Sequence, residues 1–259
     1  MIHRAYPNVL AMIQEAETIK HGHHTGRDDW RFGPDWKDEA ETRAGLLAGA
    51  APAAARAAYE AMREEFRELA ASAPAPTRRR RQVWADQGED IDVDRMNARH
   101  DRPWRSTKIG RAAPSIRLAI NYALSCTNGP ANFAALAAAA ALIADRYTLA
   151  GYAVEIVAVH ASTGSSSAKR HEAEALIYSY PVKGSGEPLD IERLLATGAP
   201  GLCRHYVHAI IGRDTGDPLR GICRLPQCTA EVLGVAHIIG NHWEGAKQQV
   251  RQIVSQAAA

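Results

Sequence analysis

The pattern of apolar and polar positions becomes regular near residue 114 of the chain. From there, short runs of aliphatic and β-branched residues alternate with longer apolar or amphipathic runs, which predicts strands alternating with helices. The expected strands are 116–124, 154–160, 171–182, 206–212 and 232–239, and the expected helices are 131–150, 189–196 and 243–255. This order predicts an α/β core with a doubly wound, mostly parallel sheet.

The residues before this core show other patterns. A short helix is expected at 9–19 within a polar, irregular stretch, and Pro52 opens a longer helix because proline is well suited to the first helical turn. An alanine–proline linker and a charged stretch follow. We therefore predict an N-terminal helical and irregular segment at 1–77, a charged connecting segment at 78–113 and the α/β core domain at 114–259.

Composition narrows the class of protein. With 46% hydrophobic and 23% charged residues among 259, the chain has the balance of a soluble globular protein. A formal net charge of +2 does not require a nucleic-acid partner, and four cysteines do not form a disulfide framework. The N-terminus lacks the apolar core of a signal peptide, and the longest apolar run, 131–144, is too short to span a membrane. We expect a cytoplasmic protein with no membrane partner.

The end of the first expected core strand carries the most informative pattern. Ala123-x-Ser125-x-Thr127 is followed by an alanine-rich helix and a second strand. The arrangement resembles the opening of a von Willebrand factor A-like domain, whose first strand ends in Asp-x-Ser-x-Ser. The resemblance implies a von Willebrand factor A-like or related Rossmann-like core. It also implies a degenerate metal-ion site, because Ala123 stands where the metal-binding aspartate would be.

A wider set of motifs resembles an uncharacterised family of phage-encoded proteins. The motifs are an Asp-Ile-Asp-type segment at 90–94, Trp104 before the first core strand, the turn at 123–127, the Gly-Tyr-x-Val-Glu signature at 151–155 and the segment 182–191. This family implies no activity that can be transferred to the chain. The von Willebrand factor A-like strand order implies a protein-binding module, by analogy of fold.

Ser125 and Thr127 are the hydroxyl groups that fit a divalent-cation site, and carboxylates from other loops could complete it. Oxygen ligands of this kind suit Mg²⁺ or Ca²⁺. The candidate carboxylates are Asp190, Asp214 and Asp217. Asn121 lies two residues too early on the strand to replace the missing aspartate. Alternatively, the two hydroxyls bond to loop backbone groups and cap the following helix. No cofactor is predicted overall.

A zinc site is a second metal hypothesis. Cys203, His205 and His208 could converge with Cys223 and Cys228 if the loop between them folds back. The spacing matches no standard zinc finger or ribbon, and the separation of His205 from His208 places them on opposite faces of the expected strand. Thiols buried as small apolar groups are the alternative.

Other histidines carry little information. The cluster His21, His23 and His24 lies in a glycine-containing stretch and is expected in a surface loop. His160 and Asp190 could serve as a base and the group that orients it, although their spacing gives no specific support.

The connecting segment mixes basic residues with tryptophans, which single-stranded nucleic acid or a phosphate-rich surface would bind. The candidate nucleic-acid contacts are Arg78, Arg79, Arg80, Arg81, Trp84, Arg102, Trp104 and Arg105, with Arg95, Arg99 and Lys108 nearby. An acidic run, 89–94, lies between the two basic groups. Pairing of acidic with basic side chains inside the segment is therefore an alternative.

These observations favour a non-enzymatic phage or mobile-element protein that works as an interaction or assembly module. The expected contact loops carry Ser125, Thr127, Asn128 and Lys183, and the partner is another protein or a second copy of the chain. Nucleic-acid binding through 78–108 is the first alternative. An enzyme with its site at the carboxyl ends of the core strands is the second.

Overall fold

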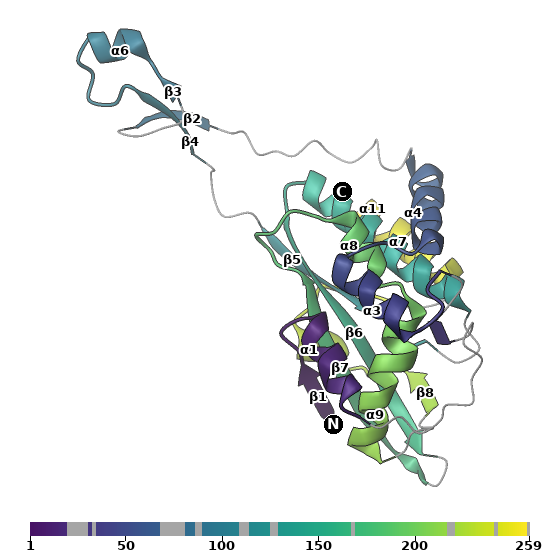
Figure 1. Cartoon of the computed structure of the whole chain (residues 1–259). Helices are drawn as coiled ribbons and strands as arrows, with labels where there is room; N and C mark the ends of the chain where they lie inside the picture. Colours follow the sequence, from purple (N-terminus) through teal and green to yellow (C-terminus); the bar gives the residue numbers. More distant parts are fainter. Residues whose placement is uncertain are drawn as a thin grey trace.

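A computed structural model describes the chain at residues 1–19, 31–32, 35–67, 81–85, 90–108, 114–124, 129–166, 169–216, 221–240 and 243–257. These residues form a main sheet covered by helices and a separate small sheet (Figure 1). Among them, no helix combines the length and the apolar character that crossing a membrane requires.

The main sheet follows the order β1-β7-β6-β5-β9, and β8 pairs with the far end of β6. The strand β5 pairs in parallel with β6 and β9, and β1 pairs in parallel with β7. The β6–β7 and β6–β8 pairs are antiparallel. The prediction of an α/β fold with a mostly parallel sheet is thereby confirmed. The strands are β1 (Ile2–Ala5), β5 (Ser115–Asn121), β6 (Ala153–Ser166), β7 (Lys169–Lys183), β8 (Gly221–Arg224) and β9 (His237–Ile239).

The helices are distributed unequally over the two faces of this sheet. Leu118 and Ile120 of β5 point into the large core, to which most of the helices contribute buried side chains. Ala119 points the other way, into a smaller core closed by Leu233 and Val235 at α10. The helices are α1 (Val9–Glu17), α3 (Glu39–Ala48), α4 (Ala53–Glu65), α7 (Pro130–Leu149), α8 (Ile191–Ala196), the π-helix η1 (Leu202–Val207), α9 (His208–Thr215), α10 (Thr229–Leu233) and α11 (Trp243–Ala257).

The long helix α7 is the centre of the large core. It begins with Pro130 at its first turn, and every residue from Phe133 to Ala144 is buried. A helix that is apolar on all sides must be covered on all sides. The sheet covers one side, while Tyr59 and Met62 of α4 and Val250 of α11 belong to the same core. Alanine side chains allow these helices to approach α7 closely.

Residues that were expected in the irregular N-terminal segment contribute to this architecture. The strand β1 adds an edge to the main sheet by pairing with β7, and Tyr6 continues the ladder with a hydrogen bond from its N–H to the Ser179 carbonyl (2.8 Å). Met12 and Ile13 of α1 are buried in the large core. The expected helices at 9–19 and after Pro52 are present as α1 and α4.

One expected strand is wrong, and another is much shorter than expected. The stretch 206–212 is helical, in η1 and α9, and Tyr206, Val207 and Ile210 are buried in the large core; a short apolar run of this kind fits a helix as well as a strand. The stretch 232–239 divides into the end of α10 and the three-residue strand β9, with Gly234 between them in a left-handed conformation (φ +60°). That positive φ is favourable for glycine and ends the helix.

The charged connecting segment forms its own small sheet, which we call the arm (residues 81–85 and 90–108). Its strands β2 (Arg81–Ala85), β4 (Trp104–Lys108) and β3 (Asp90–Ile91) pair antiparallel in that order, and α6 (Val93–Asn97) lies between β3 and β4 in sequence. Figure 1 shows the arm apart from the main sheet.

Candidate functional site

The carboxyl end of β5 is the place where the sequence predicted a degenerate cation site. Here the side chain of Asn121 bonds to the neighbouring strand: its Oδ1 accepts from the Ala161 N–H (2.9 Å) and its Nδ2 donates to the Ala161 carbonyl (3.2 Å). The same Oδ1 accepts from the Ala123 N–H (3.2 Å). Asn121 thus fastens the strand end. Ser125, Thr127 and Asn128 lie outside the described residues.

The carboxylates proposed for the cation have other tasks. Asp190 caps α8, where its Oδ1 accepts from the Arg193 N–H (3.0 Å). Asp214 lies at the end of α9, pairs with Arg4 (2.8 Å) and Arg213 (2.8 Å), and accepts a hydrogen bond from Tyr178 (3.1 Å). Two guanidinium groups neutralise a carboxylate that a cation would need. Asp217 lies outside the described residues.

Two of the proposed zinc ligands lie on opposite faces of the sheet. Cys203 belongs to the large core and Cys228 packs against the smaller core on the opposite face. His205 faces Glu39, with 3.3 Å between Nε2 and Oε2, and its ring lies against Phe32. Within the part of the chain that the structure describes, no three His, Cys, Asp or Glu side chains form a group able to hold a metal ion. The side chain of Cys223 and the cluster His21, His23 and His24 lie outside the described residues.

A thiol–imidazole pair that sequence reasoning missed lies under the sheet. His160 Nδ1 is 3.2 Å from Cys203 Sγ, and the thiol donates a hydrogen bond to the Tyr122 carbonyl (3.2 Å). The ring of His208 meets the ring of His160 edge-on, with 5.7 Å between centroids. The pair joins residues 43 positions apart, so no local motif announces it. Asp190 caps α8 and His160 bonds to Cys203, so the base-and-orienter hypothesis gains no support.

Burial keeps this pair neutral. His160 and Cys203 are each only 2% exposed. Burial raises the pKa of the Cys203 thiol to about 12 and, together with the nearby His208, holds the pKa of His160 well below its usual value. A nucleophilic cysteine needs a thiolate and an accessible position. In this conformation the pair has neither property.

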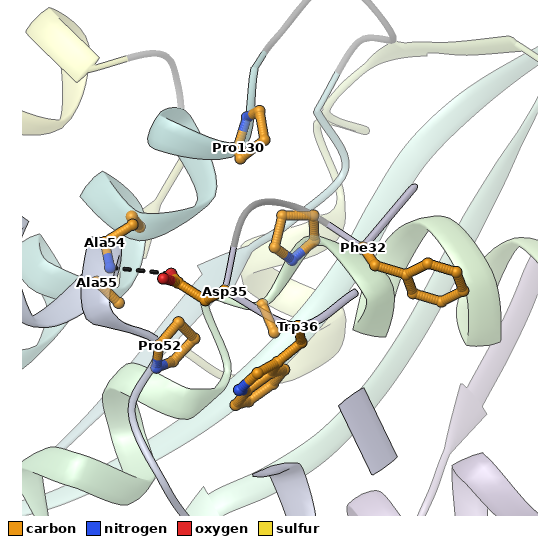
Figure 2. A pocket seen from close by; sticks show the side chains of 11 residues that line it. Phe32, Asp35, Trp36, Pro52, Ala54, Ala55 and Pro130 are labelled. Carbon is orange, nitrogen blue, oxygen red and sulfur yellow. Dashed lines mark hydrogen bonds between the residues drawn. The ribbon is translucent and has the colours of Figure 1, made fainter. Parts of the chain in front are cut away.

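A small hollow lies where α4 and α7 begin, beside residues 198–200 (Figure 2). Phe32, Trp36 and Pro130 contribute to its walls, and Asp35 accepts a hydrogen bond from the Ala54 N–H at the start of α4 (3.0 Å). The space inside holds about one water molecule. It is too small for an organic substrate.

In the arm, the predicted nucleic-acid contacts are engaged with one another. The guanidinium groups of Arg95 and Arg105 lie 4.2 Å and 5.3 Å from the Trp84 ring centroid, and Arg105 pairs with Asp92 (3.3 Å). The hydrogen bond from the Arg95 N–H, followed by that from Arg105, lowers the pKa of Asp92. This is the internal pairing that the acidic run had suggested as an alternative.

The remaining predicted contacts are placed differently. Trp104 is half-buried opposite Ala85 and Ile91, and Arg102 is exposed. Arg78, Arg79 and Arg80 lie outside the described residues, and only the backbone of Arg81 is described, in β2. Lys183 is buried, and its Nζ donates to the carbonyls of Val154 (2.5 Å) and Gly184 (3.0 Å). It therefore ties the end of β7 to the start of β6.

The arm lacks a core of its own in its described part. None of its described side chains is buried, and three large apolar ones are exposed: Trp84 (38%), Val93 (54%) and Met96 (47%). Val93 and Met96 are three residues apart on α6 and share one face of that helix.

One of the comparisons with known proteins identifies a family. The family model of DUF7192, a domain of unknown function, matches residues 2–222, which include β1, the arm and the strands β5, β6 and β7. The comparisons with curated proteins and with solved structures find no match. Because the matched region spans most of the sequence, the chain belongs to the DUF7192 family.

Proposed function

We propose that the chain is a non-enzymatic protein–protein interaction module, of the kind that phage or mobile-element assemblies use, and that the arm is its main contact element. The observation that supports this proposal best is the arm without a core. In its described part it exposes Trp84, Val93 and Met96 and buries no side chain.

A small sheet of this kind needs support from outside. Three strands become stable when an apolar face is packed against something, and an isolated unit of this size buries too little surface to stabilise itself strongly. Aromatic residues, methionine and arginine are the side chains that protein interfaces enrich. A protein partner that covers Trp84, Val93 and Met96 would supply the missing burial.

The charge of the arm favours protein over nucleic acid. Residues 81–108, which are the arm together with residues 86–89, contain six basic and six acidic residues and so have no net charge, whereas 78–108 has nine basic residues and a net charge of +3. Nucleic-acid affinity depends on an excess of basic groups that neutralise phosphates. The guanidinium groups of Arg95 and Arg105 already lie over the Trp84 ring, and a stacking base would have to displace them. Nucleic-acid binding through the basic segment 78–108 stays the alternative.

The core also favours a binding role over a catalytic one. The strand β5, the long helix α7 and the parallel strand β6 follow the order on which the von Willebrand factor A-like, Rossmann-like resemblance rests. We infer a core of that type. Its sheet carries helices on both faces, although on the face of the smaller core the helix is the short α10. Ala123 offers no carboxylate for a cation, and the His160–Cys203 pair is buried and neutral. The loop carrying Ser125, Thr127 and Asn128 is proposed as a second contact.

Site-specific photocrosslinking tests the proposal. A photoreactive amino acid replaces Val93 in the arm, and the matched control replaces Leu47, which is 43% exposed on α3. In the cell that makes the protein, we expect a discrete protein adduct from position 93 and not from position 47. The double variant Val93→Ser, Met96→Ser should lose the complex and keep its fold, because both side chains are exposed.

Light scattering and the absorbance ratio of the purified chain would reveal bound nucleic acid, which is the outcome that opposes the proposal. Co-purifying nucleic acid that salt removes, and that replacement of Arg78 to Arg81 by alanine abolishes, would overturn the proposal in favour of the alternative. Equal crosslinking from positions 93 and 47 would also contradict it, since the contact would then not involve the arm.

A further inference from the structure

A pair of histidines joins the main sheet to the helical layer at one buried point. His160 comes from β6, and His208 is the first residue of α9, directly after η1. Their rings meet edge-on, 5.7 Å apart, and Cys203 of η1 bonds to the other side of His160. Any change in the charge of His160 therefore acts on the contact between β6 and the η1–α9 unit.

The bonding pattern fixes the tautomer of His160. The Cys203 thiol donates to the Tyr122 carbonyl, so its sulfur accepts from His160 Nδ1–H. Nε2 then carries the free lone pair, and this buried atom has no hydrogen-bond partner among the described residues. A proton from acidic solvent would bind at that atom.

The groups that face His160 do not compensate a positive charge. The neutral Cys203 thiol of η1 and the ring of His208 of α9 lie beside it. On the neighbouring strand β7, the residue paired with His160 is Tyr178. Tyr122 of the segment after β5 contributes a carbonyl to Cys203, and Tyr180 of β7 is buried near that thiol. These phenols stay neutral because burial raises their pKa values.

The charged groups of this region are already committed. On the β7 side, Asp214 accepts from Tyr178 and pairs with Arg4 and Arg213. Arg204, next to Cys203 in η1, is itself a buried cation that lies over the Phe133 ring (4.8 Å) and would oppose a further positive charge. A protonated His160 would thus be a buried cation without an anion, which is strongly unfavourable.

We propose that His160 is an acid-sensitive latch, in which its protonation releases η1 and α9 from β6 and exposes Cys203. The element released is suited to this role, because π-helical turns are less regular than α-helix and are frequently found at functional sites. The latch is independent of the arm, so its failure and the failure of the proposed interaction function are separable.

The direction of the effect follows from proton linkage. The closed state holds the pKa of His160 below 6.5, whereas the open state leaves it near its usual value. Below about pH 6.5 the open state therefore binds up to one more proton, and the opening constant rises by up to about tenfold per pH unit. Above about pH 6.5 the contribution to closure is fully present.

The thiol of Cys203 reports the opening. Labelling by 4,4′-dithiodipyridine, which reacts with thiols in mild acid, is followed at Cys203 by peptide mass mapping and is normalised to the unfolded chain at each pH. We expect protection at neutral pH, and an opening constant that rises about tenfold or more in total as the pH falls from about 6.5 to about 5. A pH-independent rate over this range would overturn the latch.

Three variants separate the latch from ordinary acid unfolding. In His160→Gln the slope of the logarithm of the opening constant against pH should fall by about one, because one proton is lost from the linkage. His160→Asn is the second test if His160→Gln does not fold, and its slope should fall by the same amount. His237→Gln is the control: His237 is half-buried at the start of β9 and bonds to Tyr147 (3.1 Å). If its slope falls as well, the opening is global and the local latch is wrong.

Discussion

The Asn121 side chain makes the hydrogen bonds that a strand backbone would make, at the point where β5 stops pairing with β6. The regular ladder ends with Asn121 opposite Val159, and the Asn121 amide then reaches Ala161 two residues further along. An amide side chain has both a carbonyl acceptor and an NH₂ donor, so one residue satisfies both backbone groups of Ala161. Asn121, which lies too early on the strand to replace the missing aspartate, thus has a structural role at the end of β5.

Asn121→Ala should lower the free energy of unfolding by about 2–3 kcal/mol, because both backbone groups of the buried Ala161 and the N–H of the partly buried Ala123 lose their partner. Urea denaturation followed by circular dichroism measures the change. The matched control is Asn97→Ala on the exposed surface of α6, which should stay within about 0.5 kcal/mol of the parent chain. A loss for Asn121→Ala as small as that of the control would contradict the assigned role.

At the scale of elements, the position of α3 depends on the close contact between Gly45 and the Trp36 ring. Gly45 lies inside α3, where the Trp36 ring packs directly against its Cα, and a methyl group at that position would overlap the ring. Trp36 is itself packed against the large core. A glycine in a helix normally lowers helix stability, so its presence here is explained by the contact and not by the helix.

Gly45→Ala should therefore destabilise the protein by about 1–3 kcal/mol through overpacking. Helix propensity alone would predict the opposite, a gain of about 0.5–1 kcal/mol. Thermal and urea unfolding decide the sign. Gly186→Ala serves as the comparison, because open space surrounds that position, and its stability should hardly change. A stabilised Gly45→Ala variant would show that Trp36 moves aside without cost.

The elements also show how far the sequence could predict the fold. The strands β5, β6 and β7 and the helix α7 were found because each is long and its pattern is clear. The run from Tyr206 to Gly212 was taken for a strand because short apolar runs rich in β-branched residues fit either structure. Only packing in the large core selects the helix there. The four-residue strand β1 has too few positions to show an alternating pattern.

For the candidate site, the limits are different. The sequence placed Ala123 at a strand end and suggested internal pairing in the arm, and both are seen at β5 and at Arg105–Asp92. It could not bring His160 to Cys203, because that contact depends on the packing of η1 against β6. Nor could it show that Cys203 and Cys228 lie on opposite faces, since strand direction and layer are properties of the complete sheet.

At the scale of the whole molecule, two parts of very different burial share one chain. The main sheet has a large apolar core built around α7, to which α1, α4 and α11 all contribute. The arm has its strand pairing and the Arg95–Trp84–Arg105 contact, with no buried side chain in its described part. Local stability follows the density of buried apolar contacts, so the two parts should open independently.

Hydrogen exchange of the purified chain should show this difference. Backbone amides of β2 and β4 are expected to exchange with protection factors at least about a hundredfold lower than those of β5 and β6, because opening the arm exposes little apolar surface. Covering Trp84, Val93 and Met96 by a partner should raise the protection of the arm and leave β5 unchanged. The Val93→Ser, Met96→Ser variant should keep the low protection without responding to the partner. Equal protection of β4 and β5 in the isolated chain would mean that the arm is stable alone, and the main argument for its role as a contact element would fail.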